Sequence, residues 1–445
     1  MSNKNSNIQI YWKTVPFLSG LSTLERRLGI LYNKIRKTNR GAAVMDTLVE
    51  LFDKEPVENI YAAVALQPKQ VVYIGDSRLM TAGRQENIRR FFAQKSSGTK
   101  LHFYSIRTDD VEQIGTVLEE ITQRFDNCVC DVTGGTDLLL VSVGILCARK
   151  KIPVLFFNIH TGNFVNVSGC EDFSSFSSPS LTVENLMALA GGAFIRHGHY
   201  SPELEVPETR DIIEAVWEVL RTDIPGWGKQ ASYFQQAAKG SENGNESLTV
   251  RAPVHIHVNF RNIVHCNPRF MIRLAETGAI RNYRMENDRV RYTYRNPLFR
   301  RLLSDAGVWL ELYTYYTAQR TNFFDDLQTS VLIDWDGNTE SNGTVNELDD
   351  ILIKGIVPLF ISCKIGVPSV LAINEIDSLA RRFGGSMAKP VLVTASRLDD
   401  IPEPTRQRAA DMGVTLLDAG NMSRSAFARS LMKLAGASKD YFKRR

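Results

Sequence analysis

Apolar positions along the chain change their spacing after about residue 45, and from there they predict an α/β domain. Short apolar runs alternate with stretches in which apolar residues recur every three or four positions, as in amphipathic helices. Strands are expected at 70–76, 100–106, 127–132 and 154–159, and helices at 46–52, 56–66, 87–95, 111–125 and 138–150. Strands that alternate with helices are typical of a doubly wound parallel sheet, which binds ligands beyond the carboxyl ends of its strands.

A second apolar pattern, at 345–364, predicts two strands joined by a tight turn at Gly355. Side chains alternate along a strand, so Glu347 and Asp349 point to the same face. Lys364 comes near the end of the second strand, and folding of the hairpin is expected to bring it beside Asp349.

An acid on one strand and a lysine at the end of the next is the pattern of PD-(D/E)xK nuclease sites. Carboxylates hold a hard divalent ion such as Mn²⁺ or Mg²⁺, which polarises a phosphodiester and activates a water. The lysine supplies positive charge to the developing transition state. A preceding helical run at 307–319 offers Glu311 as a further carboxylate. The alternative is a solvated strand face with a surface ion pair.

Two polar loops follow predicted strands of the first domain, GDSR at 75–78 and DVTGGTD at 131–137. Gly134 and Gly135 let backbone N–H groups approach a ligand closely, and the following helix presents its positive end to an anion. Thr133 and Thr136 add hydroxyl donors. The loop lacks the GK[ST] ending of a P-loop and is not GxGxxG, so a purely structural turn remains the alternative.

The middle of the chain reads as a connector. Residues 196–209 form a candidate boundary, and a helix at 268–278 followed by a small hairpin suggests a winged-helix-like fold. The connector is rich in basic and aromatic residues: Arg269, Arg273, Arg281, Arg284, Arg289, Arg291, Arg295, Arg300, Arg301, Tyr283, Tyr292 and Tyr294. This region either tracks a phosphate backbone or forms a solvated hinge with structural arginines. His255 and His257 lack an evident third metal ligand and are interpreted as packing residues.

Composition sets outer limits on the organisation. A chain of 445 residues predicts two or three domains. Its net charge of +4 is compatible with an anionic partner. The six cysteines include no CxxC pair, which favours reduced thiols and a cytoplasmic protein. No apolar run reaches membrane-spanning length.

The first 44 residues carry eight Lys or Arg and one acid, and 22–37 has the spacing of an amphipathic helix. This segment is interpreted as an arm for a membrane surface or nucleic acid or as a transit-like segment, or else as an accessory helix or sequence upstream of a true start at Met45. Two polar loops, 239–247 and 338–344, are expected to be mobile, the second as a lid.

Two groups of motifs together resemble a known family. The run DTLVELFDKEPVENIYAAVALQPKQVVYIGD (46–76), with DVTGGT (131–136), resembles CARF domains, the ligand sensors of type III CRISPR defence. The later run GVWLE…NELDD…LFISCKIG (307–366) resembles the PD-(D/E)xK domain fused to them. The likeness is to the CRISPR ancillary nucleases that cyclic oligoadenylates activate, and it covers most of 45–394.

The resemblance implies four parts: a basic extension (1–44), a Rossmann-like CARF domain (45–195), a partly winged-helix-like connector (196–300) and a restriction-endonuclease-like PD-(D/E)xK domain (301–445). It implies that the CARF domain binds cyclic tetra-adenylate across a homodimer axis. The nuclease would cut DNA, RNA or both with Mn²⁺ or Mg²⁺ in antiviral defence. Ligand binding would rotate the two CARF domains, and the connector would carry this motion to the nuclease domains.

Carried over by position, eight residues would line the ligand pocket: Gly75, Asp76, Ser77, Arg78, Thr133, Gly134, Gly135 and Thr136. Catalysis would fall to Glu311, Asp349 and Lys364, with metal held by Asp349, Glu311 and Glu347.

The sequence departs from the family pattern at two positions. Asp137 stands where many members have lysine, and Ser362 stands where a glutamate often precedes x-Lys. Glu347 or Glu311 is therefore expected to supply the missing carboxylate. Ser362 also favours the alternative function, a CARF and winged-helix transcription regulator with an inactive nuclease domain, whereas Asp349 with Lys364 speaks against it.

Overall fold

The computed structural model describes residues 45–95, 98–159, 161–170, 179–196, 201–239, 247–259, 262–335, 337 and 345–436. Three sequence predictions lie outside these residues: the helix at 22–37, most of the loop at 239–247 and the loop at 338–344. Within the described ranges no helix is both long enough and apolar enough to cross a membrane.

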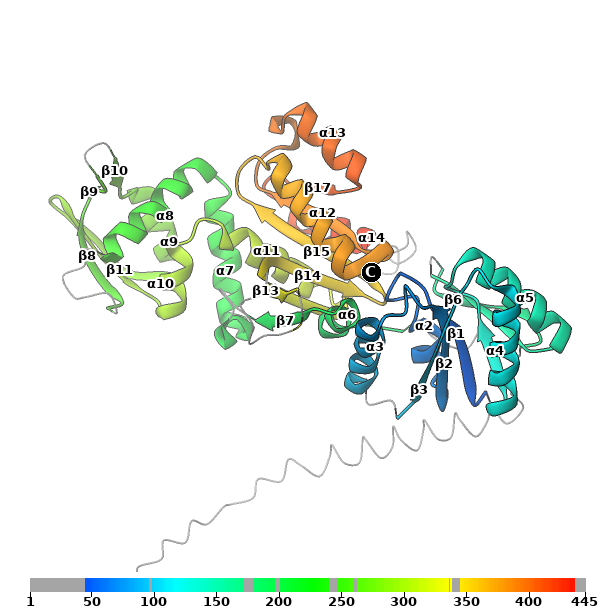
Figure 1. Ribbon diagram of the computed structural model, residues 1–445. Helices are drawn as coiled ribbons and strands as arrows, with labels where there is room; N and C mark the ends of the chain where they lie inside the picture. Colours follow the sequence, from blue (N-terminus) through cyan, green and yellow to red (C-terminus); the bar gives the residue numbers. More distant parts are fainter. Residues whose placement is uncertain are drawn as a thin grey trace, which may run out of the picture. The chain divides into compact units, whose positions relative to one another are not determined.

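The first sheet has six strands in the order β3-β2-β1-β4-β5-β6. They are β1 (Thr47–Leu51), β2 (Gln70–Asp76), β3 (Lys100–Ile106), β4 (Cys128–Asp131), β5 (Val154–Asn158) and β6 (Asn163–Ser168). Strands β1 to β5 run parallel, and β6 lies antiparallel at the edge beside β5 (Figure 1). The strand order reverses between β1 and β4, so the loops after these two strands flank the crevice in which such sheets bind ligands.

Helices cover both faces of this sheet, which confirms the doubly wound α/β prediction. On one face lie α4 (Val111–Arg124) and α5 (Asp137–Lys150), and on the other α2 (Tyr61–Leu66) and α3 (Ala82–Gln94) (Figure 1). Beneath α4 and α5, apolar residues such as Val49, Leu118 and Val143 form one buried cluster.

The helix expected at 46–52 is wrong, because this segment forms β1. All five residues of β1 are buried, since strands flank it on both sides and helices cover both faces. A strand buried on both faces loses the alternation of apolar and polar residues by which a sequence separates strands from helices. The helix expected at 56–66 begins only at Tyr61.

A short segment links the first sheet to the last one. Helix α6 (Val183–Ala190) begins with a capping box between Thr182 and Asn185, and it packs against both α3 and α12. Strand β7 (Ala193–Arg196) then pairs with β13 in the second large sheet. The expected boundary between residues 195 and 196 therefore falls inside a strand of the second large sheet. The 3₁₀ turn η1 (Pro202–Glu205) and helix α7 (Pro207–Leu220) follow.

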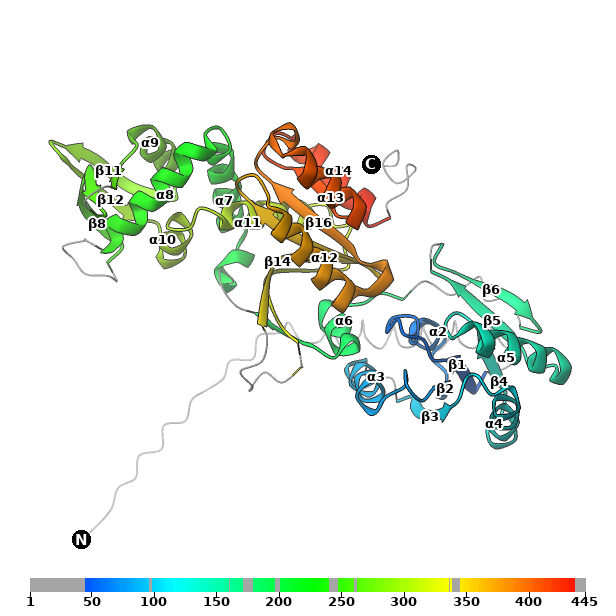
Figure 2. The ribbon, with the colours of Figure 1, turned by 45° about the horizontal axis from the view of Figure 1, so that its top comes forward.

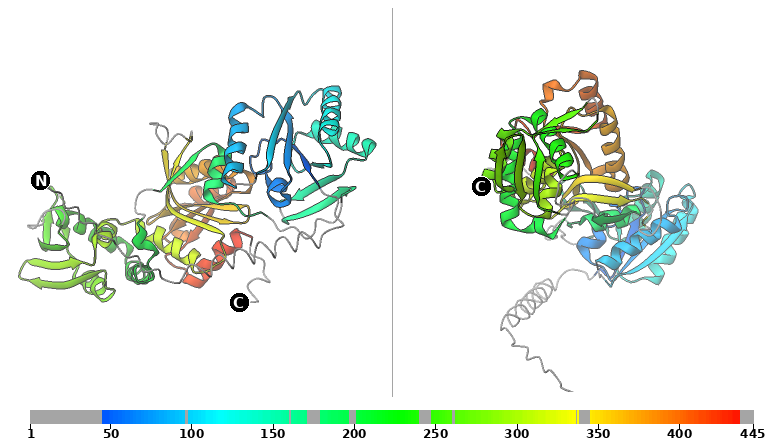
Figure 3. Two further views of the ribbon diagram at one scale, coloured as in Figure 1. Left: turned by 90° about the horizontal axis from the view of Figure 1, so that it is seen from below. Right: turned by 90° about the vertical axis from the view of Figure 1, so that its left-hand side faces the viewer.

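The middle lobe combines helices with short antiparallel strands (Figure 3). Its helices are α8 (Ile224–Lys239), α9 (Pro268–Glu276) and α10 (Pro297–Leu303), and its strands are β8 (Thr249–Pro253), β9 (His255–His257), β10 (Ile263–His265), β11 (Ile280–Glu286) and β12 (Arg289–Tyr294). Strands β11, β12 and β8 form an antiparallel sheet in that order. The β11–β12 hairpin directly follows α9, the order of helix and hairpin that the sequence predicts.

The second large sheet has the order β17-β16-β15-β14-β13-β7. Its further strands are β13 (Asp326–Asp334), β14 (Val345–Lys354), β15 (Val357–Lys364), β16 (Lys389–Thr394) and β17 (Thr415–Asp418). Strands β13 to β15 are antiparallel, and β15 to β17 are parallel. The hairpin predicted at 345–364 is confirmed, with its turn at Gly355 in the left-handed region at a φ of +60°.

Helices lie on both faces of this sheet. Helix α11 (Val308–Gln319) is almost wholly buried and packs on β13, β14 and β15, whereas α12 (Val370–Gly384) packs on β15 and β16 (Figure 2). Thr314 of α11 contacts Cys363, so α11 covers the face of β15 to which Cys363 points. The remaining elements are η2 (Gly385–Met387), η3 (Leu398–Asp400), α13 (Glu403–Met412) and α14 (Arg424–Leu434).

Gly75, at the end of β2, is buried and has a packing role. A Cβ at this position would lie 2.5 Å from Cβ of Phe52, which is itself 2% exposed. Any side chain at position 75 would therefore displace Phe52, the first residue of the loop that follows β1.

We expect Gly75→Ala to destabilise the protein by about 1–3 kcal/mol, the usual cost of overpacking a core. Gly83→Ala is the matched control, because a Cβ at Gly83 meets no atom within 4 Å. Alanine is the better helix former, so the control is expected to be neutral or slightly stabilising. Urea denaturation of the two variants measures the difference, and equal stabilities would contradict the packing role.

Candidate active site

The end of the β14–β15 hairpin is where the two strands separate. Their last paired residues are Asp350 and Ile361, and before Asp350 strand β14 continues to pair only with β13. The backbone N–H of Cys363 instead donates to Oδ2 of Asp349 (2.5 Å). The carboxylate of Asp349 thus occupies the gap where the next backbone hydrogen bond of the hairpin would lie.

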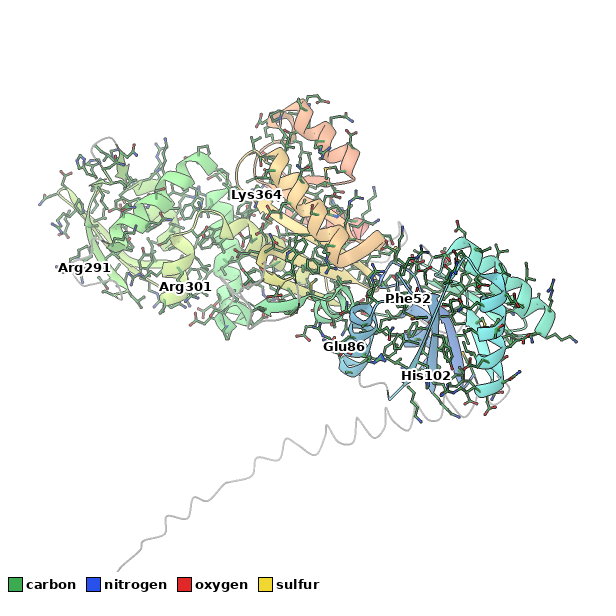
Figure 4. All side chains as sticks on the ribbon, in the orientation of Figure 1. Phe52, Glu86, His102, Arg291, Arg301 and Lys364 are labelled. Atoms are coloured by element: carbon green, nitrogen blue, oxygen red, sulfur yellow. The ribbon has the colours of Figure 1, made fainter. Side chains whose placement is uncertain are left out.

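Lys364 lies beside this carboxylate, as the sequence predicts. Its Nζ is 3.9 Å from Oδ2 of Asp349, and the hydroxyl of Ser362 donates to the same oxygen at 3.3 Å. The lysine side chain is 43% exposed, and that of Asp349 is 15% exposed. The ammonium is therefore reachable from solvent while the carboxylate is held in place. Figure 4 labels Lys364 at the end of β15.

Glu311, in the first turn of α11, adds a second carboxylate to this region. Burial raises the pKa of Glu311 well above its usual range, and the charge of Asp349 raises it further. Burial also raises the pKa of Asp349, although the neighbouring Lys364 opposes this shift. Glu347 is exposed two residues before Asp349 and adds to the negative charge felt by both acids.

The donor chemistry of this cluster fits a divalent cation. Among the residues that the structure describes, no three His, Cys, Asp or Glu side chains come close enough together to hold a metal ion by themselves. Oδ1 of Asp349 nevertheless makes no hydrogen bond to a described residue, and neither does the carboxylate of Glu311. Mg²⁺ is often held by one or two carboxylates and completed by substrate phosphate, so Asp349 and Glu311 suffice as protein donors.

Asp350 is a buried acid that sequence reasoning did not assign to the site. Side-chain alternation turns it away from Asp349, toward the face covered by α11. It is 0% exposed, and neither of its carboxylate oxygens has a hydrogen-bond partner. Burial raises the pKa of Asp350 well above its usual range, and Asp349 adds to this shift. The doubled acid in NELDD was the available signal, but the sequence does not reveal which acid is buried.

The TGGT loop packs tightly on the end of β1. A Cβ at Gly134 would lie 2.8 Å from Cβ of Asp53, and Gly135 has a φ of +111°. The N–H of Gly135 donates to Oδ2 of Asp53 (2.9 Å), so a carboxylate of the chain itself occupies one amide expected to face an anion. Asp53 was not predicted as part of this edge, because only the folded loop brings it there.

The two threonines of this loop have different roles. The hydroxyl of Thr133 donates to Oδ1 of Asp131 (2.5 Å) and accepts from the N–H of Phe157 (2.8 Å), so it ties the loop to the sheet. The hydroxyl of Thr136, at the start of α5, is buried without a hydrogen-bond partner. Thr136 is therefore the loop threonine whose hydroxyl the fold leaves without a hydrogen bond.

Under this loop lies a pair of buried acids. Glu50 on β1 is directly opposite Asp131 on β4, and both are at most 2% exposed. Burial raises the pKa of Glu50 well above its usual range, and the charge of Asp131 adds to the shift. The pair is therefore expected to retain a proton at neutral pH, which lets Asp131 keep its hydrogen bonds to Thr133.

The loop at 75–78 has fewer side chains exposed to a ligand than the sequence predicts. Gly75 is buried, and Asp76 is 3% exposed because it accepts hydrogen bonds from Arg78 and Thr108. Ser77 and Arg78 are exposed. From this loop, Ser77 and Arg78 are the side chains that reach solvent.

Two interpretations of the connector are wrong. His255 and His257 are exposed, and His255 meets His265 across β9 and β10, with 2.6 Å between the two Nδ1 atoms. They are therefore not packing residues of a core. Tyr292 and Tyr294 are at most 1% exposed, so they do not form part of a surface for nucleic-acid bases.

Because the pKa of Asp350 is raised in the folded protein, its contribution to stability is present at low pH and is lost as pH rises through the folded pKa. We therefore expect Asp350→Asn to be more stable than the wild type at pH 8, by an amount that shrinks toward pH 5. The slope is up to about 1.4 kcal/mol per pH unit while the folded protein alone remains protonated.

Thermal unfolding of both proteins across this pH range without divalent ions measures the difference. Asp400→Asn is the control, because Asp400 is exposed and should give a flat difference. A flat difference for Asp350→Asn as well would contradict the buried, protonated acid.

Known proteins resemble this chain in fold rather than in sequence. No known family model and no curated protein matches it. Protein VC1899 from Vibrio cholerae superposes with a TM-score of 0.69 at 15% identity, covering 89% of this chain and 100% of that one. Can2 from Sulfobacillus thermosulfidooxidans, solved in complex with cyclic tetra-adenylate, superposes with a TM-score of 0.61 at 16% identity, covering 88% and 98%. The chain thus shares the α/β fold of VC1899 and Can2.

Proposed function

We propose that the protein is a metal-dependent nuclease that cyclic tetra-adenylate activates, acting on DNA, RNA or both. The observation that carries this proposal is the 3.9 Å approach of Lys364 Nζ to Asp349 Oδ2 where β14 and β15 separate. A solvent-reachable ammonium beside a fixed, half-satisfied carboxylate is an arrangement suited to a phosphodiester and a hard cation.

Each residue of the site has a separate task. The N–H of Cys363 and the hydroxyl of Ser362 fix Oδ2 of Asp349, which leaves Oδ1 to face a cation. Asp349 and Glu311 would hold Mn²⁺ or Mg²⁺, which polarises the phosphodiester and lowers the pKa of a bound water. Lys364 is placed to stabilise negative charge on the phosphate oxygens. Ser362 then orients the carboxylate instead of replacing a metal ligand.

The acid cluster also couples cation binding to proton release. Burial raises the pKa of both Glu311 and Asp349, and the charge of Asp349 raises the pKa of Glu311 further. A cation needs both carboxylates ionised, so binding is expected to release protons and to strengthen as pH rises. Glu347, which is exposed, would contribute charge at the edge of this cluster or join it when substrate is present.

The proposed regulatory site lies at the carboxyl edge of the first sheet. Support comes from the loops after β1 and β4, from the free hydroxyl of Thr136, and from the exposed Ser77 and Arg78. The Can2 structure contains cyclic tetra-adenylate, which makes this ring the first activator to test. A ring with two-fold symmetry suits a site shared by two copies of this chain, so we propose a homodimer. The activator must bind the active state more tightly than the inactive one.

Lys364→Met is expected to lower the rate of cleavage by about 10²–10³-fold, the effect of removing a positioned charge from a developing oxyanion. Lys354→Met is the matched control, since Lys354 lies at the other end of β14 and pairs with Asp325 (2.8 Å). Cleavage of plasmid and labelled RNA with Mn²⁺ and cyclic tetra-adenylate measures both variants. Retention of nucleic acid by the wild type without cutting would contradict the nuclease and favour a regulator.

Thr136→Val is expected to raise the concentration of cyclic tetra-adenylate needed for half-maximal cleavage by roughly two- to tenfold, the cost of one neutral hydrogen bond. The maximal rate should stay the same, because the substitution acts on ligand binding. Thr116→Val is the control, since the exposed Thr116 hydroxyl donates to the backbone of its own helix. Equal rates with and without the ring in the wild type would exclude this activator.

A further inference from the structure

The three-stranded sheet of the middle lobe has one buried and one exposed face. Val250, Ala252, Val290, Tyr292 and Tyr294 point into the core and are at most 1% exposed. The residues between them point the other way, and several of these are exposed arginines. The basic residues of this surface therefore come from the strands of the sheet and not from the helices of the lobe.

The strand register arranges three of these arginines in one row. Arg291 on β12 lies directly opposite Arg284 on β11 and directly opposite Arg251 on β8. All three are exposed and, within the described part of the chain, none forms an ion pair. We call Arg251, Arg284 and Arg291 the arginine row; Figure 4 labels Arg291. Neighbouring strands lie about 4.8 Å apart, so three like charges stand side by side.

Such a row is unfavourable for the isolated fold. Like charges directly opposite each other destabilise a sheet. Solubility does not require them, because a surface of mixed charges is equally hydrophilic. Two further arginines extend the same face, Arg281 opposite Thr293 and Arg289 opposite Glu286. Glu286, also on this face, lies opposite Arg289 and not opposite any arginine of the row. The positive charge of Arg251, Arg284 and Arg291 is therefore not neutralised by it. A bound polyanion would supply the missing negative charge.

The rest of the surface narrows the kind of polyanion. Binding of single-stranded nucleic acid commonly uses exposed aromatic rings on which bases stack. Tyr292 and Tyr294 alternate onto the buried face, and Tyr283 on β11 is half-buried and packs against the core, so these described strands present no fully exposed ring. The hydroxyls of Thr249 and Thr293 bond to each other (3.0 Å), so they are not free to read a ribose 2′-hydroxyl. What remains are guanidinium donors suited to phosphate.

We propose that the arginine row is a docking surface for the phosphate backbone of double-stranded DNA, bound without regard to sequence. This surface is separate from the residues of the candidate active site and from the loops at the edge of the first sheet. It gives the chain an affinity for duplex DNA that needs neither cation nor activator. Because phosphate contacts release counterions, this affinity falls steeply with salt.

The test compares the full-length wild type with the triple variant Arg251→Gln, Arg284→Gln, Arg291→Gln. Binding to a labelled 30-base-pair DNA duplex is measured by fluorescence anisotropy in EDTA, from 50 to 200 mM salt. Three phosphate contacts contribute about 2.7 to the slope of log affinity against log salt, so the variant should lose that much slope. At 200 mM salt at least a tenfold loss of affinity is expected.

A double variant, Arg269→Gln with Arg301→Gln, is the matched control. Both arginines are exposed in the same lobe but lie on α9 and α10 (Figure 4 labels Arg301). The control should keep the wild-type slope. Thermal unfolding of the DNA-free triple variant should show equal or higher stability, because the substitutions relieve repulsion, and this readout separates binding from misfolding.

Three results would overturn the proposal: an unchanged slope in the triple variant, a loss seen with single-stranded RNA but not with the DNA duplex, or a change in oligomeric state measured by light scattering. The last would assign the row to an interface between copies. All these measurements are made without divalent ions, so failure of the nuclease proposal would leave them interpretable.

Discussion

The carboxylate of Asp349 takes the place of a backbone hydrogen bond between β14 and β15, and the rest of the candidate site depends on this substitution. The N–H of Cys363 finds its partner in a side chain instead of in the opposite strand. This satisfies a buried donor and fixes the carboxylate as the strands move apart. Lys364 lies beside the same acid at this gap, and Glu311 on α11 is near enough for the charge of Asp349 to raise its pKa.

The same region brings several carboxylates together in partly buried surroundings, where their ionised forms are unfavourable without a cation. Asp349, Asp350 and Glu311 all have raised pKa values, chiefly because burial removes them from water. Lys364 compensates one charge at most. Perturbed acids in a solvent-reachable gap favour a functional site over a structural one, because a stable fold has no need of unpaired buried carboxylates. The Glu50–Asp131 pair beneath the TGGT loop also consists of buried acids, and burial raises the pKa of both.

The sequence was most informative where local pattern and chemistry coincide. The 345–364 hairpin, its turn at Gly355 and the approach of Lys364 to Asp349 follow from alternation and from turn chemistry alone. Strand β1 was mistaken for a helix because burial on both faces removed its periodicity. Asp53, and the alignment of Arg251 with Arg284 and Arg291, were missed for another reason. Their positions depend on loop packing and on strand register, which pair residues far apart in the chain and leave no mark on either segment.

The most direct test of the account is to measure Mn²⁺ binding to the protein without nucleic acid. Isothermal titration calorimetry in two buffers of different ionisation enthalpy gives both the affinity and the number of protons released. The wild type is expected to bind Mn²⁺ with release of protons, and Asp349→Asn to bind it at least tenfold more weakly with fewer protons released. Unchanged affinity and proton release in Asp349→Asn would contradict the claim that the carboxylate of Asp349, fixed by the N–H of Cys363, is the centre of the site.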